Sequence, residues 1–280
     1  MSLPPLPLTA RARVAPAVVA LLVAAATAGH AQTPARFRTV ESDRLVVQSV
    51  RGTLGVTIES EGEFTVRQVR ADSLVLTYTN LSVEQYCACG RLSIDTKPIV
   101  GTPIAIRLDA AGRGRVLSAV PGDDAGGRAS DPVTQFGGMI FRVDRSHLAA
   151  GAEWTDSTTE SRTRTAKDST TATTTITRKG AYRVLGDTTV AGHDGWVVSV
   201  HEQIRIADKL KTPEKGIGGN ATLEGTDEGI VVVAKDGVGF LLRSERASLQ
   251  GWLDIPVDAI RSPVRVPVRT YFDATLIRLP

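Results

Sequence analysis

The feature that most constrains the fold of this 280-residue chain is a period of two in its apolar residues. It is clearest in the segment WVVSVHEQIRI, residues 196–206, where apolar and polar side chains alternate. Side chains that alternate in this way lie on opposite faces of an extended strand. This segment therefore predicts a strand with one apolar face and one face toward water. The apolar positions are Trp196, Val198, Val200, Ile204 and Ile206, and the polar ones are Ser199, His201, Gln203 and Arg205.

Short runs of the same kind, separated by turns, continue through most of the chain. Candidate strands in the first half are residues 44–51, 56–58, 63–69, 73–79, 104–108 and 114–120. In the second half, residues 229–234 and 238–245 flank Lys235-Asp236-Gly237, and Asp-Gly between such runs is a strong hairpin signal. Residues 261–279 predict the last one or two strands, and Pro263 and Pro267 favour an edge position there. Helical signals are confined to residues 131–139 and 144–150.

The composition agrees with a chain made of strands, because only 5% of residues are aromatic while the β-branched Thr and Val are abundant. We therefore predict an all-β antiparallel fold with little helix, in the form of a curved sheet, a sandwich or an open half-barrel. The fold could consist of two similar halves. Residues 106–118 and 231–244 both have the order apolar strand, polar turn, Gly-x-Gly and apolar strand, as a duplicated unit would. The alternative to duplication is that the two segments are similar only because all hairpins have this order. Core candidates are Val46, Leu74, Leu76, Ile106, Leu108, Trp154, Trp196, Val198, Val200, Val232, Phe240, Leu242 and Trp252.

A threonine-rich segment, residues 154–182, contains eleven Thr. Flexible linkers are rich in Gly and Ser and extended stalks are rich in Pro, but neither Gly nor Pro occurs between Trp154 and Arg178. We predict a long hairpin that runs out along 154–165, turns at 166–169 and returns along 170–182. A disordered connector between two halves is the alternative.

The first 31 residues have the three parts of a secretory signal peptide. Arg11 and Arg13 precede an apolar run over residues 14–28, and Gly29-His30-Ala31 supplies small residues for cleavage after Ala31. The run is shorter than the roughly 20 residues of a membrane-spanning helix, although an uncleaved anchor is the alternative. We predict a periplasmic or extracellular protein with no integral membrane segment after cleavage, and with an N-terminal β half (32–150) and a C-terminal β half (151–280).

Charge and motifs argue against several function classes. The formal charge is +3, and Arg11 and Arg13 supply +2, so the chain without them carries +1. No Lys/Arg cluster with interleaved aromatics is present, so nucleic acid is not an expected partner. No Gly-x-Ser-x-Gly elbow occurs, no expected helix follows the Gly-x-Gly segments, and the histidines lack ligand spacing. We therefore predict a non-enzymatic protein with no catalytic, cofactor-binding or metal-binding residue and no cofactor.

Cys87 and Cys89 are the only cysteines in the chain. In an exported protein, two cysteines suggest a disulfide, but a bridge between positions i and i+2 closes a small, strained ring. Three interpretations remain open: a structural disulfide, two free thiols, or a pair with a redox or metal-binding role.

The segments LAAGAEWTDSTT and AYRVLGDTTVAGHDGWVVSV resemble a pattern found in exported bacterial all-β proteins of unassigned function. The residues that carry this resemblance are Gly151, Trp154, Asp156, Tyr182, Val184, Val190 and Gly192. It covers the second half of the chain best and implies no reaction and no catalytic residue. In architecture, consecutive long strands with little helix look like the curved half-barrels of periplasmic lipoprotein carriers, a likeness that concerns the fold alone.

These observations lead to three hypotheses about function. The first is an exported protein that binds an apolar ligand or an envelope protein on the concave face of its sheet. The second is a structural or adhesion-like module of the cell envelope that uses the threonine-rich hairpin as its contact surface. The third is an envelope redox or metal protein that works through Cys87 and Cys89.

Overall fold

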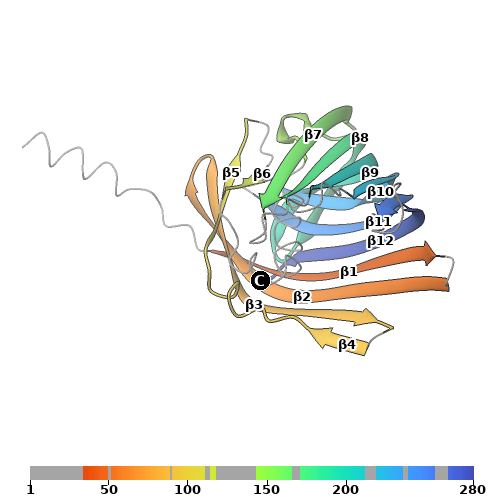
Figure 1. Ribbon diagram of the computed structural model, residues 1–280. Coiled ribbons are helices and arrows are strands. Elements are labelled where there is room, and N and C mark those ends of the chain that lie inside the picture. The colour runs from red at the N-terminus through yellow and green to blue at the C-terminus, as the bar shows by residue number, and fades with distance from the viewer. Residues whose placement is uncertain are drawn as a thin grey trace, which may run out of the picture. The chain divides into compact units, whose positions relative to one another are not determined.

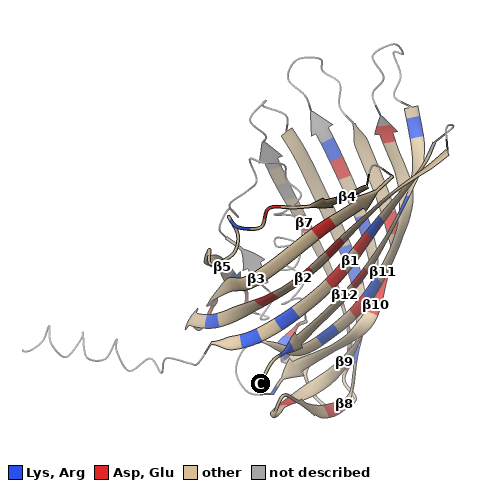
Figure 2. Cartoon of the chain, turned by 90° about the horizontal axis from the view of Figure 1, so that it is seen from below, with Lys and Arg blue, Asp and Glu red and all other residues tan. Residues whose placement is uncertain are grey.

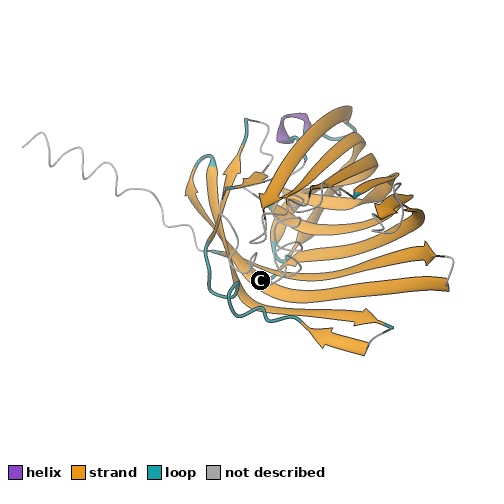
Figure 3. Cartoon of the chain, viewed as in Figure 1, coloured by secondary structure: helices purple, strands orange, loops and turns teal. Residues whose placement is uncertain are grey.

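The computed structural model describes residues 34–49, 52–88, 90–110, 114–117, 143–165, 171–211, 219–235, 239–255 and 264–280. Strands make up nearly all of this part of the chain (Figure 3), as the sequence pattern predicts. A single 3₁₀ turn, η1 (Arg145–His147), is the helical element within the described ranges. No helix in these ranges has the length and apolar character needed to cross a membrane.

The strands form one antiparallel sheet that is curved and not closed (Figure 1). Its order is β6-β5-β3-β2-β1-β12-β11-β10-β9-β8-β7, and β4 pairs with β3 outside this path. The strands are β1 (Ala35–Ser49), β2 (Gly52–Arg70), β3 (Ser73–Cys87), β4 (Gly90–Ser93), β5 (Ile104–Leu108), β6 (Gly114–Val116), β7 (Glu153–Thr165), β8 (Thr171–Val190), β9 (His193–Lys211), β10 (Asn220–Ala234), β11 (Phe240–Ile255) and β12 (Val264–Arg278).

Two runs of neighbouring strands meet in the middle of this sheet. From β7 to β12, each strand pairs with the next one along the chain, and β1, β2 and β3 do the same. The two runs are joined by β1 and β12, which pair from Phe37–Arg278 to Val47–Val268. Residues 34–280 form one compact unit. Whether the segments 32–150 and 151–280 are similar, independent halves stays a prediction.

The alternation of side chains gives the sheet two different faces. The concave face, called the inner face below, carries the main core cluster, which includes Phe37, Phe64, Leu76, Val198 and Leu276. Charged residues recur along the strands (Figure 2), and most of those that alternate with the buried apolar positions are exposed on the outer face. Ion pairs connect neighbouring strands on this face, among them Arg246–Asp273 at 2.6 Å and Arg205–Glu224 at 3.2 Å. Such exposed pairs stabilise the fold only slightly, but they keep the outer face in water.

The threonine-rich segment forms the long hairpin that its composition predicts. β7 and β8 pair without interruption from Glu153–Arg183 to Thr165–Thr171, which excludes a disordered connector over these residues. The predicted turn at 166–169 lies outside the described residues. On the outer face, hydroxyl pairs join Thr159 to Thr177, Ser161 to Thr175 and Thr163 to Thr173 at 3.1–3.3 Å. The threonines thus favour the extended backbone through their β-branched side chains, and their hydroxyls form hydrogen bonds between the two strands.

Most predicted core residues are buried, but Trp252 is 49% exposed, so its assignment to the core was wrong. The β10–β11 register places Trp252 on the outer face, opposite Thr222. The edge position predicted from Pro263 and Pro267 was also wrong, because β12 lies between β1 and β11. Pro267 is tolerated there since the pairing of β12 with β1 ends at Val268. Val46, Trp196 and Leu242 are only partly buried.

Two sequence predictions of helix meet different outcomes. Residues 131–139 lie outside the described residues. Within 144–150, the chain forms only η1, and Asp144 caps it by accepting a hydrogen bond from the Ser146 backbone N–H at 2.9 Å. Arg145 donates a hydrogen bond to the Ala234 carbonyl oxygen at 2.8 Å, which attaches this turn to β10.

Candidate functional site on the inner face

An apolar row crosses seven strands of the inner face. Its members are directly opposite one another in the strand registers, so their side chains form one strip, which is interrupted at Gly251 because glycine has no side chain. In spatial order from β2 to β8, they are Leu54, Val47, Val268, Gly251, Leu223, Ile206 and Ile176. Leu54 is 58% exposed, and Leu45 beside the row is 37% exposed. Exposed apolar side chains on the concave face of a sheet are a feature of ligand sites.

A charged belt lies between this apolar row and the closed apolar core. It consists of Glu41, Asp43, Arg178, Glu202, Asp227, Arg243 and Glu245, all on the inner face. Five of these side chains are fully buried or nearly so, and Asp227 has no exposed area at all. Burying charged groups costs free energy unless they are paired, so the belt must be held by internal partners.

The first part of the belt surrounds Glu41. Thr39 and Ser60 donate hydrogen bonds to the two carboxylate oxygens of Glu41 at 3.4 and 3.3 Å. Burial nevertheless raises the pKa of Glu41 to about 7, and the positive charge of Arg243 opposes this increase. Arg243 itself forms an ion pair with Glu245, two residues along β11.

Asp43 and Tyr78 also titrate abnormally near Glu41. Burial raises the pKa of the Asp43 carboxyl, while a 2.8 Å hydrogen bond from Thr270 opposes this shift. Burial and the nearby Glu41 carboxylate raise the pKa of the Tyr78 phenol well above its usual value. The inner face therefore disfavours negative charge at this point.

The second part of the belt is centred on Glu202 in β9. Tyr182 donates a hydrogen bond to Glu202 Oε1 at 2.6 Å, and Arg178 Nε lies 3.8 Å from Glu202 Oε2. Tyr182 stacks on Trp154, with ring centroids 5.1 Å apart, and Trp154 stacks on His147 at 5.4 Å. A line of aromatic rings thus connects η1 to the charged belt.

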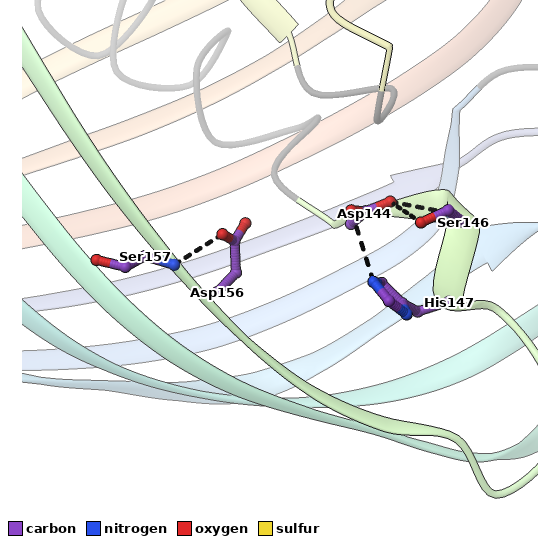
Figure 4. A network of polar contacts seen from close by, with 5 residues as sticks. All are labelled: Asp144, Ser146, His147, Asp156 and Ser157. Carbon is purple, nitrogen blue, oxygen red and sulfur yellow. Dashed lines mark hydrogen bonds and ion pairs between the residues drawn. The ribbon is translucent and has the colours of Figure 1, made fainter.

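His147 and Asp156 belong to a polar network at the start of this line (Figure 4). His147 Nε2 lies 3.8 Å from Asp144 Oδ2, and the Ser146 hydroxyl donates to Asp144 Oδ1 at 2.7 Å. Asp156 accepts a hydrogen bond from the Ser157 backbone N–H at 2.7 Å. The contacts of Asp144 lie within the turn and cap η1, whereas the contact of Asp156 lies within β7. The turn is held to the sheet by the stacking of His147 on Trp154 and by the hydrogen bond from Arg145 to the Ala234 carbonyl oxygen.

Cys87 ends β3 and is disulfide-bonded. Cys89 lies outside the described residues, so the pairing of the two cysteines stays a prediction. Within the described ranges, no group of three or more His, Cys, Asp or Glu residues could hold a metal ion.

Some of the residues that carry the resemblance to exported bacterial all-β proteins lie close together in the structure, and others do not. Trp154 and Tyr182 are opposite each other in the register of β7 and β8, and their rings stack. Gly151 and Gly192 have positive φ angles of 73° and 79° and lie in turns before β7 and between β8 and β9. They are therefore positions that favour glycine for a conformational reason.

Sequence reasoning missed the charged belt, although a signal was present. Glu202 interrupts the apolar face of WVVSVHEQIRI, between Val200 and Ile204. Asp227 and Glu41 likewise occupy inward positions in their strands. A charged residue in phase with the apolar positions of a strand is the signal for a buried polar site, and each of these residues shows it.

No known family model matches the sequence, and no curated protein is similar to it. Among solved structures, the chain is similar to OmpF of Salmonella typhi in complex with daunomycin, with 8% identity and a TM-score of 0.24. That similarity covers 86% of this chain and 97% of the other. A DUF1329 family protein from Desulfovibrio piger is 12% identical with a TM-score of 0.16, covering 94% and 92% of the two chains. Neither similarity is strong enough to support an inference about activity.

Proposed function

We propose that this is an exported, non-enzymatic protein of the periplasm or the extracellular space that binds an apolar ligand on the inner face of its sheet. Export rests on the signal-peptide pattern of residues 1–31, which lie outside the described residues. Binding rests on one observation above all, the apolar row that crosses seven strands, with exposed Leu54 at its end and exposed Leu45 beside it.

The charged belt limits how a ligand can lie on this surface. An apolar ligand on the row is expected to extend away from the belt, because an apolar group offers neither a hydrogen bond nor a charge to the polar side chains of the belt. Binding would bury the exposed parts of Leu45 and Leu54, and each fully buried apolar side chain contributes about 1.5–3 kcal/mol.

The test is a fluorescence titration of the mature protein with N-phenyl-1-naphthylamine, an uncharged apolar probe. The variant Leu54→Asp places a charge in the apolar row and is expected to weaken probe binding by roughly tenfold or more. Leu185→Asp is the matched control, since Leu185 is 55% exposed and lies in β8 outside the row. Failure of the probe to bind, or equal loss in both variants, would reject the proposal.

The hydroxyl ladder of β7 and β8 favours a second candidate, an adhesion-like envelope module that uses this hairpin. The ladder presents regularly spaced hydroxyls at an edge of the sheet. Replacing Thr173, Thr175 and Thr177 by Val removes these hydroxyls but keeps β-branched side chains. Under this candidate, the variant stops co-sedimenting with isolated bacterial envelopes, while Thr226→Val/Thr275→Val elsewhere on the outer face does not. Unchanged co-sedimentation of the triple variant would reject this role.

A further inference from the structure

Trp252 is exposed on the outer face in a way that packing does not explain. It is 49% exposed, whereas Trp154 is 9% exposed and belongs to the core. It lies on β11 directly opposite Thr222 of β10 and Pro267 of β12. A large indole ring left in water on a strongly polar sheet face is a feature of recognition surfaces.

The indole forms one side of a cavity of about 550 Å³ on this face. Gly251 and Val268 contribute to the lining from the sheet itself, and Gln48 and Pro267 lie at the end toward β1. The volume falls in the range of small-molecule sites, about 300–1,000 Å³. All the lining residues are within the described ranges.

Planar polar groups lie beside the ring. Glu224, Gln250 and Arg269 are successive cross-strand neighbours on β10, β11 and β12, one row away from Trp252. Glu224 forms an ion pair with Arg205. The side chains of Gln48, Gln250 and Arg269 have no hydrogen-bond or ion-pair partner within the described part of the chain. Two amides and a guanidinium thus offer both donors and acceptors to a ligand.

A second cavity on the same face differs from the Trp252 cavity in its lining. It measures about 670 Å³ and is lined by Glu228, Arg246 and Asp273 among others. There, Arg246 pairs with Asp273 at 2.6 Å and Glu228 with His201 at 3.1 Å, and no aromatic residue takes part in the lining. Its Arg246, Asp273 and Glu228 are thus engaged in ion pairs, whereas the side chains of Gln250 and Arg269 beside Trp252 have no such partner among the described residues.

We propose that the Trp252 cavity binds a saccharide, with one pyranose ring stacked on the indole. A pyranose has an apolar face of C–H groups and a rim of hydroxyls, which matches an aromatic ring with amide, carboxylate and guanidinium groups at its edge. Gln250 and Arg269 bind the hydroxyls nearest the ring, and Gln48 binds those toward β1. This site is on the opposite face from the apolar row, so the proposal does not depend on the ligand proposed above.

The test is saturation-transfer-difference NMR on the mature protein with cellotriose, maltotriose, chitotriose and mannotriose. At least one trisaccharide is expected to receive saturation and to compete with the others. Trp252→Ala is expected to weaken that binding by roughly tenfold or more, and Gln250→Ala and Arg269→Ala by several-fold each. Trp252→Tyr should keep part of the affinity because an aromatic face remains.

Tyr271→Ala is the matched control, because Tyr271 is an aromatic residue of the outer face that is 38% exposed and does not line the cavity. It should leave binding unchanged, and far-UV circular dichroism should show each variant folded. The proposal is overturned if none of the four trisaccharides binds, or if Trp252→Ala binds as the wild type does. Selective binding of benzyltrimethylammonium without any saccharide would also overturn it, by making this a cation site.

Discussion

Glu41 is the residue whose titration is most tightly linked to folding. Its pKa is about 7 in the folded chain, above the 4.5 of an exposed glutamate, so between these values the folded chain holds a proton that the unfolded chain has lost. Stability therefore falls as the pH rises through this window and is level above it. The loss due to Glu41 is about 3 kcal/mol, since each pKa unit corresponds to about 1.4 kcal/mol.

The variant Glu41→Gln is expected to remove this part of the pH dependence. Urea unfolding between pH 4.5 and 8 should show the variant gaining stability relative to wild type as the pH rises. Glu59→Gln is the control, because Glu59 is an exposed residue of the neighbouring strand β2. Parallel curves for wild type and Glu41→Gln would contradict the prediction.

Gly229 in β10 allows a close approach that any side chain would prevent. A Cβ at this position would overlap the Ser244 carbonyl oxygen and lie 2.6 Å from Glu245 Cγ. Gly229→Ala should therefore cost roughly 2–4 kcal/mol of unfolding free energy, measured by urea denaturation. At Gly55 of β2, a Cβ would meet nothing within 4 Å. Gly55→Ala should change stability by less than about 1 kcal/mol, and equal effects at the two sites would refute the steric argument.

At the scale of the element, the β7–β8 hairpin combines strand propensity with cross-strand hydroxyl pairs. Replacing Thr173, Thr175 and Thr177 by Val should weaken the hairpin slightly, because each cross-strand pair contributes only about 0.2–1 kcal/mol. Replacing them by Ala should weaken it more, since β-branching is lost as well. Hydrogen exchange of the β7 amides measures the difference. Equal exchange in the Val and Ala variants would show that β-branching contributes nothing here.

At the scale of the whole molecule, the β1–β12 ladder joins the two runs of strands. The hydrogen bond between Asp43 and Thr270 connects residues 227 positions apart. Deleting residues 264–280 would expose the edges of both β1 and β11 and uncover part of the inner face. We expect the truncated protein to lose cooperative thermal unfolding and to be digested rapidly by trypsin.

A shorter deletion is the control for this prediction, because it shortens the chain without removing the β1–β12 ladder. Deleting only Leu279 and Pro280, which follow β12, should leave cooperative unfolding intact. A truncated chain 1–263 that still unfolds cooperatively, with two smaller sheets, would show that each run of strands folds alone.

The all-β class, the long hairpin and most of the core could be predicted from the sequence, because alternation and β-branching act locally. Leu74, Leu76 and Val198 are buried as their pattern predicts. The position of Trp252 could not be predicted, because the face that a side chain takes depends on the register of its strand with its neighbours. The charged belt was overlooked for a related reason. Its members are far apart in sequence, and Glu41 and Arg243 come near each other only through the β1–β12–β11 pairing.

By itself, the sequence therefore determined what kind of element each segment forms and which side chains alternate. Only the tertiary structure decided which strands pair, that the first and last strands meet in the middle of the sheet, and which residues share a face. Period-two alternation is the same for every strand and does not specify its partner, whereas the β1–β12 pairing depends on contacts between residues more than 200 positions apart. The apolar row, the charged belt and the Trp252 cavity are products of that pairing.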